Sequence, residues 1–335
     1  MTEAPHSLAQ TPDGCRAPGP DLLSEMLRAV RVSGSVFLNA CFSAPFGLIS
    51  PKIFDEGTPM ARLRHISVLH LVVEGAGVIE TAGGERREVA AGDIIFMPFA
   101  DRHKFWAGAP ERWAEANDIV QPGPIEGMSR IEYGGGGEPV RLVCGFVESE
   151  EFLFAPVFRT LPALTVERTG EDKVGAHVAS AVTEIVGLVD SAAPGTQALL
   201  GRLMELLFLG ILRRHIAGLP AGSRGWFAAL NDPVVGRALQ LLHANPARRW
   251  TVDELARRTG SSRTVLAGRF KTLLGRPPID YLANWRIQLA GERLRVGHES
   301  ISSIAASVGY ESEAAFMRAF KRIGGVTPGN RRMAR

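Results

Sequence analysis

The sequence has few cysteines, and none of them stands in a pair. Cys15, Cys41 and Cys144 lie far apart in a chain of 335 residues, without a CxxC motif. A disulfide framework needs several paired cysteines, and a structural zinc site needs clustered Cys or His ligands. The spacing therefore indicates neither of these as a source of stability.

Long apolar runs are also missing. The chain has no uninterrupted apolar run of about 18 residues, and its first 20 residues are polar and rich in proline without the apolar core of a signal peptide. These features predict a soluble, cytoplasmic protein with no membrane partner. Residues 1–20 can bury too little apolar surface to offset the entropy of ordering, so we expect them to be disordered.

Sequence motifs for catalysis are absent as well. The glycine-rich stretch YGGGGEPV does not continue into the GK[ST] of a phosphate-binding loop. No Ser-His-Asp order, paired-carboxylate motif or dinucleotide fingerprint occurs. We therefore predict no catalytic residues and no cofactor, and expect that the protein is not an enzyme.

The charge is divided unevenly along the chain. The net charge is +3 overall, but residues 231–335 hold 18 basic against 8 acidic residues, which leaves a net charge of −7 for the remainder. With 45% apolar residues the chain is long enough for two domains, each with its own core. The asymmetry predicts a polyanionic partner for the C-terminal part alone.

The first part of the chain changes from a β pattern to a helical one. Asp21 is a candidate N-cap of a short helix, and short β-like runs separated by turn residues then follow from about residue 35 to 149, which favours an antiparallel sandwich or barrel. Residues 170–217 are helical in pattern. The stretch 196–216 is apolar over more than one face, so it either packs on its own domain or forms a dimer with a second copy. The Gly, Pro and Ser content of residues 218–231 predicts a linker.

A repeated unit occupies the basic segment. The first copy contains, in this order, Gly260, Ser262 and the pair Phe270-Lys271. The second copy contains the same residue types in the same order, at Gly309, Ser312 and Phe320-Lys321. Each copy is a helix, a glycine turn and a second helix capped by serine, which is the helix-turn-helix pattern. The 3.6-residue period turns one face of each second helix outward, where it fits the major groove of DNA. The predicted DNA-binding residues are Ser262, Arg263, Thr264, Ala267, Gly268, Arg269, Lys271, Ser312, Glu313, Ala314, Met317, Arg318 and Lys321.

A helix that begins at the prolines of PPIDYLANWRIQLAGERLR separates the two copies. It carries a buried stripe of apolar side chains and spans roughly 25 Å. That spacer predicts two reading helices about one DNA turn, ~34 Å, apart.

Residues 233–332 resemble the double helix-turn-helix domain of AraC-type transcriptional regulators, with WTVDELA, GRFKTLLGRPPIDYL, SIAASVGYES and AFKRIGGVTP in the family's order. The resemblance implies promoter binding to double-stranded DNA and, in many members, activation through RNA polymerase. It assigns base reading to Thr264, Ala267 and Gly268, and to Glu313, Ala314 and Arg318. Gly268 departs from the family pattern, which usually has arginine at this position. Either Arg263 or Arg269 then makes the missing DNA contact, or the first unit reads mainly the backbone and the shape of the DNA.

The β region resembles the cupin-type sensor domain that precedes this DNA-binding domain in one branch of the family, as in LHLVVEGAGVIE and AAGDIIFMPFADRHKFW. The resemblance implies an α+β chain of two domains, with a cupin-like β-barrel and flanking helices at residues 21–217 and an all-α double helix-turn-helix at 232–335. Metal cupins use a first histidine where this chain has Val68, and His65 is out of register. A site of two histidines and one carboxylate at His70, Glu74 and His103, suited to Fe(II) or Zn(II), is the less favoured alternative, and we predict no metal. An organic effector near His70, Glu74, His103 and Trp106 is expected instead.

Two cysteines of the β region offer a second kind of signal. Cys41 and Cys144 lie in apolar runs, where a free cysteine is most often a small buried hydrophobe. If they meet across the barrel, their oxidation is the signal, and the implied branch includes redox-responsive members.

The leading hypothesis is thus a regulator of transcription that responds to a small molecule or a redox signal. The alternatives are a metal-dependent cupin enzyme carrying a DNA-binding domain, and an architectural DNA-binding protein without an effector.

Overall fold

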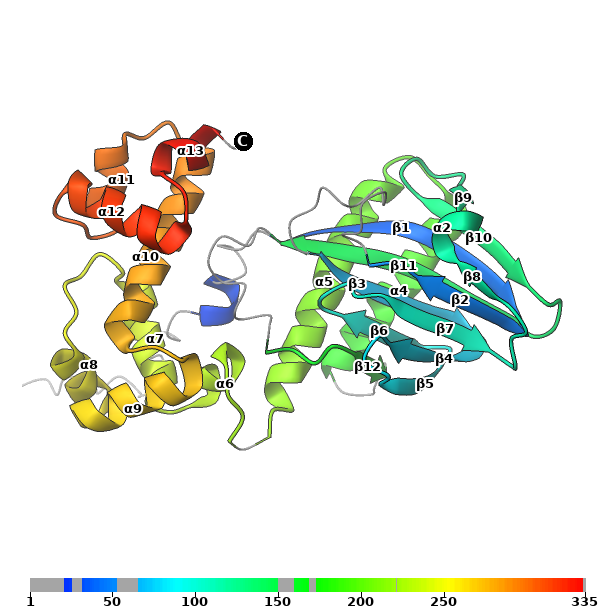
Figure 1. The fold of residues 1–335 in the computed structure, drawn as a ribbon, viewed down its shortest axis with the longest axis horizontal. Helices are drawn as coiled ribbons and strands as arrows, with labels where there is room; N and C mark the ends of the chain where they lie inside the picture. Colours follow the sequence, from blue (N-terminus) through cyan, green and yellow to red (C-terminus); the bar gives the residue numbers. More distant parts are fainter. Residues whose placement is uncertain are drawn as a thin grey trace, which may run out of the picture.

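The computed structural model describes residues 21–25, 32–52, 66–149, 160–168, 173–220 and 222–333. Residues 1–20 with their expected disorder, Cys15, and His65 lie outside this set. A β-rich N-terminal part is followed by a helical C-terminal part (Figure 1). The α+β organisation in two domains is therefore confirmed. In the described part, no helix is both long and apolar enough to span a bilayer.

Two sheets form the N-terminal part. The larger has seven strands, in the order β12 (Thr165–Arg168), β6 (Asp93–Met97), β3 (Ile66–Glu74), β11 (Pro139–Ser149), β1 (Val32–Ser43), β10 (Ser129–Gly134) and β9 (Gln121–Pro122). The smaller has five, in the order β5 (Arg86–Ala90), β4 (Ala76–Thr81), β7 (His103–Ala107), β2 (Phe46–Ser50) and β8 (Trp113–Glu115). Among the strand pairs that the structure describes, only β1–β10 and β2–β8 are parallel. The β-like pattern expected from about residue 35 to 149 thus corresponds to strands, and a short helix α2 (Ala116–Ile119) follows β8.

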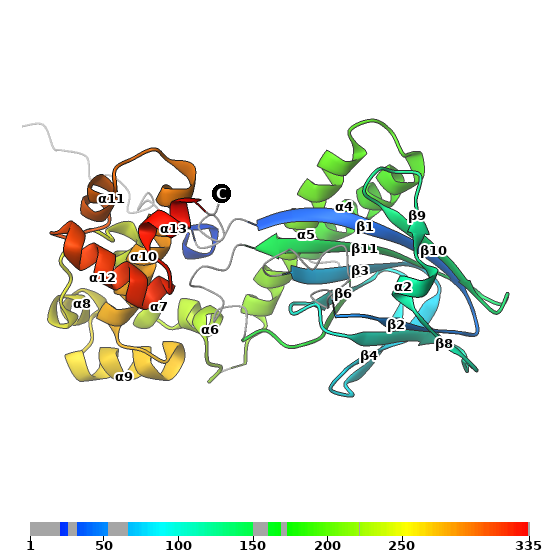
Figure 2. The ribbon, with the colours of Figure 1, turned by 45° about the horizontal axis from the view of Figure 1, so that its top comes forward.

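The sheets face each other, and helices cover one of them (Figure 2). Because side chains alternate along a strand, each strand of the larger sheet supplies two cores. Phe42 and Leu142 point toward the smaller sheet, whereas Val36 and Val143 point toward the helices α4 (Lys173–Ser191) and α5 (Thr196–Ala217). The larger sheet is therefore buried on both faces.

Small residues bring α5 close to the larger sheet. A methyl group added at Gly34 of β1 would lie 2.5 Å from the carbonyl oxygen of Gly201, and one added at Gly145 would lie 2.4 Å from Met204. At Gly34 only glycine fits without displacing the backbone of α5, whereas at Gly145 a methyl group would meet the Met204 side chain and the carbonyl oxygen of Ser35. The predicted helix over 196–216 is thus confirmed as a helix, and its buried face packs on its own domain.

The expected linker at 218–231 is only partly a loop. Residues 226–231 form helix α6 (Trp226–Asn231), and both Trp226 and Phe227 are buried. Trp226 donates a hydrogen bond from Nε1 to the hydroxyl of Tyr281 at 2.9 Å. The second half of this stretch therefore belongs to the core of the C-terminal domain, because its aromatic side chains outweigh its turn-forming composition.

The C-terminal domain contains two helix-turn-helix units on one central helix, as Figure 1 shows. The first unit holds α7 (Val235–Ala244), α8 (Val252–Thr259) and α9 (Arg263–Leu274), and the second holds α11 (Ile301–Ser307), α12 (Glu313–Gly324) and α13 (Pro328–Met333). The central helix is α10 (Pro278–Val296). Its Trp285 packs in the core of the first unit, and its Ile287 packs in the core of the second. The predicted repeat and its buried spacer helix are confirmed.

Candidate DNA-reading helices and barrel pocket

Serine caps the start of each second helix. The Oγ of Ser262 accepts a hydrogen bond from the backbone N–H of Val265 at 3.2 Å, and that of Ser312 accepts one from Ala315 at 3.2 Å. A cap of this kind satisfies one of the otherwise unpaired N–H groups of a helix start. The equal geometry shows that the two units are built in the same way, as the sequence predicts.

Helix α9 divides into a buried and an exposed face. Leu266 and Phe270 are fully buried in the core of the first unit. The opposite face exposes Arg263, Thr264 and Gly268. This face carries the predicted reading residues, and Ala267 at its edge is half-buried.

Two arginines of α9 form ion pairs within their own unit. Arg263 lies 3.4 Å from Asp253, and Arg269 lies 3.0 Å from Asp232, the C-cap of α6. Gly268 is exposed, and a methyl group added there would meet nothing within 4 Å. A longer side chain therefore has room at the position where the resemblance implies arginine.

Helix α12 also has one buried and one exposed face, and its exposed face carries several charged side chains. Phe316 and Phe320 are fully buried, with their ring centroids 5.5 Å apart. Glu313, Ala314, Arg318 and Lys321 are exposed and Met317 is half-buried. An arginine on such a face has the donors to pair with guanine, and a lysine has the charge to meet a phosphate.

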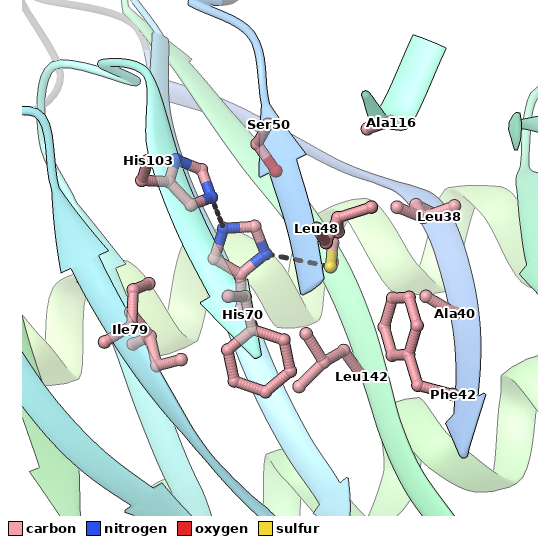
Figure 3. A pocket seen from close by; sticks show the side chains of 13 residues that line it. Leu38, Ala40, Phe42, Leu48, Ser50, His70, Ile79, His103, Ala116 and Leu142 are labelled. Atoms are coloured by element: carbon pink, nitrogen blue, oxygen red, sulfur yellow. Dashed lines mark hydrogen bonds between the residues drawn. The ribbon is translucent and has the colours of Figure 1, made fainter. Parts of the chain in front are cut away.

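A pocket lies between the two sheets of the N-terminal part (Figure 3). His70 stands on β3 opposite Cys144 on β11, and His103 begins β7 opposite Ser50 on β2. The cavity has a volume of about 30 Å³. Its other lining residues are apolar: Leu38, Ala40, Phe42, Leu48, Ile79, Ile95, Phe105, Ala116 and Leu142.

Four groups at this pocket form one chain of hydrogen bonds. The carbonyl oxygen of Asp101 lies 2.9 Å from Nδ1 of His103 and only accepts, so that nitrogen carries the proton. The Nε2 of His103 then accepts from Nε2 of His70 at 3.1 Å, and Nδ1 of His70 accepts from the thiol of Cys144 at 2.8 Å. Every ring nitrogen is used with both imidazoles neutral, and the thiol is protonated.

Burial favours the same protonation states. Desolvation lowers the pKa of His70 well below its ordinary value, and the neighbouring His103 lowers it further. Desolvation also lowers the pKa of His103 and raises that of the Cys144 thiol. The pocket therefore presents no charge at neutral pH.

Three of the predicted sensor residues lie elsewhere. Trp106 points out of the barrel and stacks edge-on against Trp113, with centroids 5.6 Å apart. Glu74 is exposed at the end of β3. Cys41 is exposed, and it pairs with Arg141 of β11. Leu38 is the residue of β1 that pairs with Cys144, and Cys41 lies three residues further along that strand. Because side chains alternate along a strand, Cys41 points to the opposite face of the sheet from Cys144. Cys41 and Cys144 therefore do not meet across the barrel, which was the condition for a redox signal carried by the pair. Among the residues the structure describes, no group of three or more His, Cys, Asp or Glu side chains is arranged to hold a metal ion.

A contact between the domains was not predicted. Residues 22–25 are helical and precede β1, and the carboxylate of Glu25 lies 3.3 Å from Nδ1 of His243 on α7. The Nε2 of His243 lies 2.8 Å from the hydroxyl of Tyr281, and the imidazole stacks on Trp285 with centroids 4.1 Å apart. The start of the sensor domain is thus connected to the core of the first helix-turn-helix unit.

Comparison with known proteins places both halves of the chain. A family model described as cupin matches residues 21–217, and one described as helix-turn-helix domain matches residues 255–334. A putative AraC-like transcription regulator of Streptomyces lividans is 48% identical over 39% of this chain and 43% of its own length. The matched region thus spans less than half of that relative.

Two further similarities cover different parts of the chain. The transcriptional regulator AlkR of Acinetobacter baylyi is 28% identical over 76% of this chain and 84% of its own length. The solved DNA-binding domain of AdpA in complex with a target DNA is 27% identical, covers 31% of this chain and 92% of that chain, and has a TM-score of 0.29.

The chain belongs to the cupin family over most of its N-terminal part and carries a helix-turn-helix domain at its C-terminal end. Both parts are similar to those of AraC-type transcriptional regulators with a cupin-like N-terminal domain, and the relatives are named as regulators of transcription.

Proposed function

We propose that the protein binds an operator in double-stranded DNA by placing α9 and α12 in two successive segments of the major groove. The observation that carries this proposal is the pair of serine-capped helices, each buried on one face and exposed on a polar face, joined by the single helix α10. Lys271 and Lys321 flank the reading faces and suit phosphate contacts.

The test is selection of bound sequences from random duplex DNA with the full chain, followed by a salt titration on one selected duplex. Two short conserved blocks about one helical turn apart, with affinity that falls steeply as salt rises, are expected. Recovery of no shared sequence would contradict the proposal.

The signal proposed for the sensor domain is a small uncharged molecule that enters the pocket at His70 and His103. No lining side chain carries a charge, so a bound carboxylate or ammonium would be buried without a partner. A cavity of about 30 Å³ holds about two water molecules. A larger effector must therefore displace lining side chains such as Phe42 or Leu48. A sugar is disfavoured because few polar groups line the pocket.

Matched probes test this class of effector. Butan-1-ol, butyrate and butylamine have similar apolar bodies and differ in charge, and xylose provides a polyhydroxylated control. Saturable binding of butan-1-ol, at least tenfold tighter than that of either ion, supports the proposal. The substitution Ala40→Leu should weaken the binding of butan-1-ol, because the larger side chain fills the cavity. Equal or tighter binding of the ions or of the sugar would sink it.

A redox signal is the alternative for the same pocket, and in this structure it would act through Cys144 alone, because Cys41 faces away. Thiol labelling before and after mild peroxide decides between the two. Modification of Cys144 at peroxide levels that change operator binding would favour the redox signal, and an unmodified thiol would exclude it.

We further propose that α5 pairs two copies of the chain. Its outer face exposes Leu199, Leu206 and Leu209 by 54%, 45% and 37%. Their separations of seven and three residues place them on one stripe of the helix, opposite the face that packs on the sheet. A second copy of α5 matches such a stripe, because a two-fold interface is self-complementary.

Two further parts of the proposed function, the action on transcription and the place of action, rest on the similarity to AraC-type regulators. We propose that the bound protein acts on RNA polymerase at the promoter, and that it works in the cytoplasm without catalysing a reaction. Transcription of a selected operator in vitro, with purified polymerase and with or without the protein, tests the first point.

A further inference from the structure

The junction between the two helix-turn-helix units contains an arginine that contacts both of them. Arg286 lies on α10 between Trp285, which packs in the first core, and Ile287, which packs in the second. The helix passes at this residue from one unit to the other. The side chain is half-buried and contacts both units.

On one side, the guanidinium group binds the loop before α8. Its Nε donates to the carbonyl oxygen of Pro246 at 2.7 Å, and a terminal nitrogen donates to that of Arg248 at 2.9 Å. The loop has its own internal support, because the indole Nε1 of Trp250 donates to the carbonyl of Asn245 at 3.0 Å. It leads directly into the N-cap of α8, the helix that packs against the reading helix α9.

On the other side, the same group lies over an aromatic ring of the second unit. The guanidinium carbon is 5.9 Å from the ring centroid of Tyr310, and that ring meets Phe316 of the reading helix α12 edge-on at 5.4 Å. Desolvation in this position lowers the pKa of Arg286. One side chain therefore connects the support of α9 with the support of α12.

The backbones of the two units also meet at this point. Gly309 has a φ of +90°, and a methyl group added there would lie 2.5 Å from the carbonyl oxygen of Ala247. Beside it, Arg249 of the first unit forms an ion pair with Glu311 of the second. The loop at 245–249 and the turn at 309–311 thus lie in contact, with Arg286 between them and α10.

We infer that Arg286 is a positioning residue that fixes the angle and distance between the two reading helices, and so makes the protein selective for one spacing of its two DNA half-sites. Without it, the units stay joined by α10, by the close approach of Gly309 to Ala247 and by the ion pair of Arg249 with Glu311, and each unit keeps its own core. Rotation of one unit about the helix is then opposed by fewer contacts. The inference rests on the proposed two-segment reading of DNA.

The substitution Arg286→Lys separates this role from charge. Lysine keeps the positive charge but has one ammonium group in place of the planar fork, so it cannot donate to both carbonyls and stack on Tyr310 with the same geometry. Arg293→Lys is the matched control, because Arg293 is an exposed arginine on the same helix away from the junction. Tyr310→Leu is a second test, which removes the aromatic face and keeps an apolar contact with Phe316.

The experiment measures the affinity of the full chain for one selected operator and for versions with one or two base pairs inserted or deleted between its two blocks. Duplexes with only one intact block are measured in parallel. The natural chain and Arg293→Lys are expected to prefer the selected spacing by at least tenfold. In Arg286→Lys and Tyr310→Leu this preference should fall below about threefold, while binding to single blocks changes less than twofold.

Each outcome decides one point. A variant that loses affinity equally at every spacing, or one that keeps the natural spacing preference, overturns the inference, and circular dichroism confirms that the variants are folded. Selection that yields no two-block operator contradicts the proposed function itself. A two-block operator with an unchanged preference in both variants leaves the proposed function intact and removes only the role of Arg286.

Discussion

Glu25 and His243 face each other at 3.3 Å across the contact between the sensor domain and the first helix-turn-helix unit. On its other side, the Nε2 of His243 lies 2.8 Å from the hydroxyl of Tyr281. That hydroxyl also accepts from Trp226, at the start of α6. A polar chain thus runs from the start of the sensor domain through the core of the first unit.

Replacement of Glu25 by alanine should loosen this contact. The loss is expected to be at most about 1 kcal/mol in the free energy of unfolding, the usual limit for a single ion-pair contact near the surface. The pKa of His243 should also fall further, because Glu25 opposes the larger effect of desolvation. Denaturant titration and an NMR titration of the imidazole measure these two effects, with the exposed Glu88→Ala as control. An unchanged His243 pKa would show that the two side chains do not interact in solution.

Acid should destabilise the protein at a pH where carboxylates are still ionised. Burial lowers the pKa of His70, His103, His215 and His243 from the ordinary 6.5. As pH falls below 6.5 the unfolded chain binds protons first, so the unfolding free energy is greatest above that pH and falls below it. Each histidine contributes at most about 1.4 kcal/mol per pH unit.

Urea unfolding at pH 7.5 and 5.5 measures this dependence. The natural chain should be less stable at the lower pH, and His70→Asn should show a smaller difference between the two conditions. Equal stability at both pH values, or an equal slope in the variant, would mean that these imidazoles are not held neutral by the fold.

Local features of the chain were predictable because they depend on residues close in sequence. Ser262 and Ser312 cap helices that begin one residue later, and Gly260 and Gly309 take the positive φ of the turns in the two repeats. These positions follow from side-chain chemistry and from the freedom of glycine. The β-like runs became strands for a similar reason, since alternation of apolar side chains suits a buried sheet.

The pocket was only partly predictable, because it depends on strand register. His70 and Cys144 are 74 residues apart, and they meet because β3 and β11 pair at those residues. The prediction places Trp106 at the pocket, but an offset of three residues from His103 in one strand puts it on the opposite face. That rule, applied to β7, would have excluded it. The contact of Glu25 with His243 joins two domains and has no signal in the local sequence.

A pair of glycine substitutions should have opposite effects on stability. Gly268 lies inside α9, whereas Gly275 ends that helix with a φ of +70°, and neither has an atom within 4 Å of an added methyl group. Only the backbone conformation distinguishes the two sites. Gly268→Ala should raise the unfolding free energy by about 1 kcal/mol, and Gly275→Ala should lower it by a similar amount. Thermal and urea unfolding measure both. A gain from Gly275→Ala would contradict the left-handed cap.

Arg318→Ala tests the reading face of α12. Arg318 is exposed while the neighbouring Phe316 and Phe320 fill the core, so its removal should leave the fold intact. Binding to a selected operator is expected to weaken by about 1–3 kcal/mol, with little change on random duplex DNA. An equal loss on both kinds of DNA would assign Arg318 to phosphate contact instead of base reading. Titration at one fixed salt concentration is required for the comparison.

Leu206→Glu tests the pairing of two copies through α5. Leu206 lies between Leu199 and Leu209 on the exposed stripe, so in a two-fold interface the new carboxylates would be buried near each other without a counter-charge. Sedimentation of the natural chain should show a dimer at micromolar concentration, and the variant should sediment as a monomer with unchanged helix content. Leu206 is exposed and is not one of the buried core residues, so the stability of the variant at low protein concentration should change by less than about 0.5 kcal/mol. A variant that remains dimeric would place the interface elsewhere, and a natural chain that is monomeric up to high concentration would remove the pairing altogether.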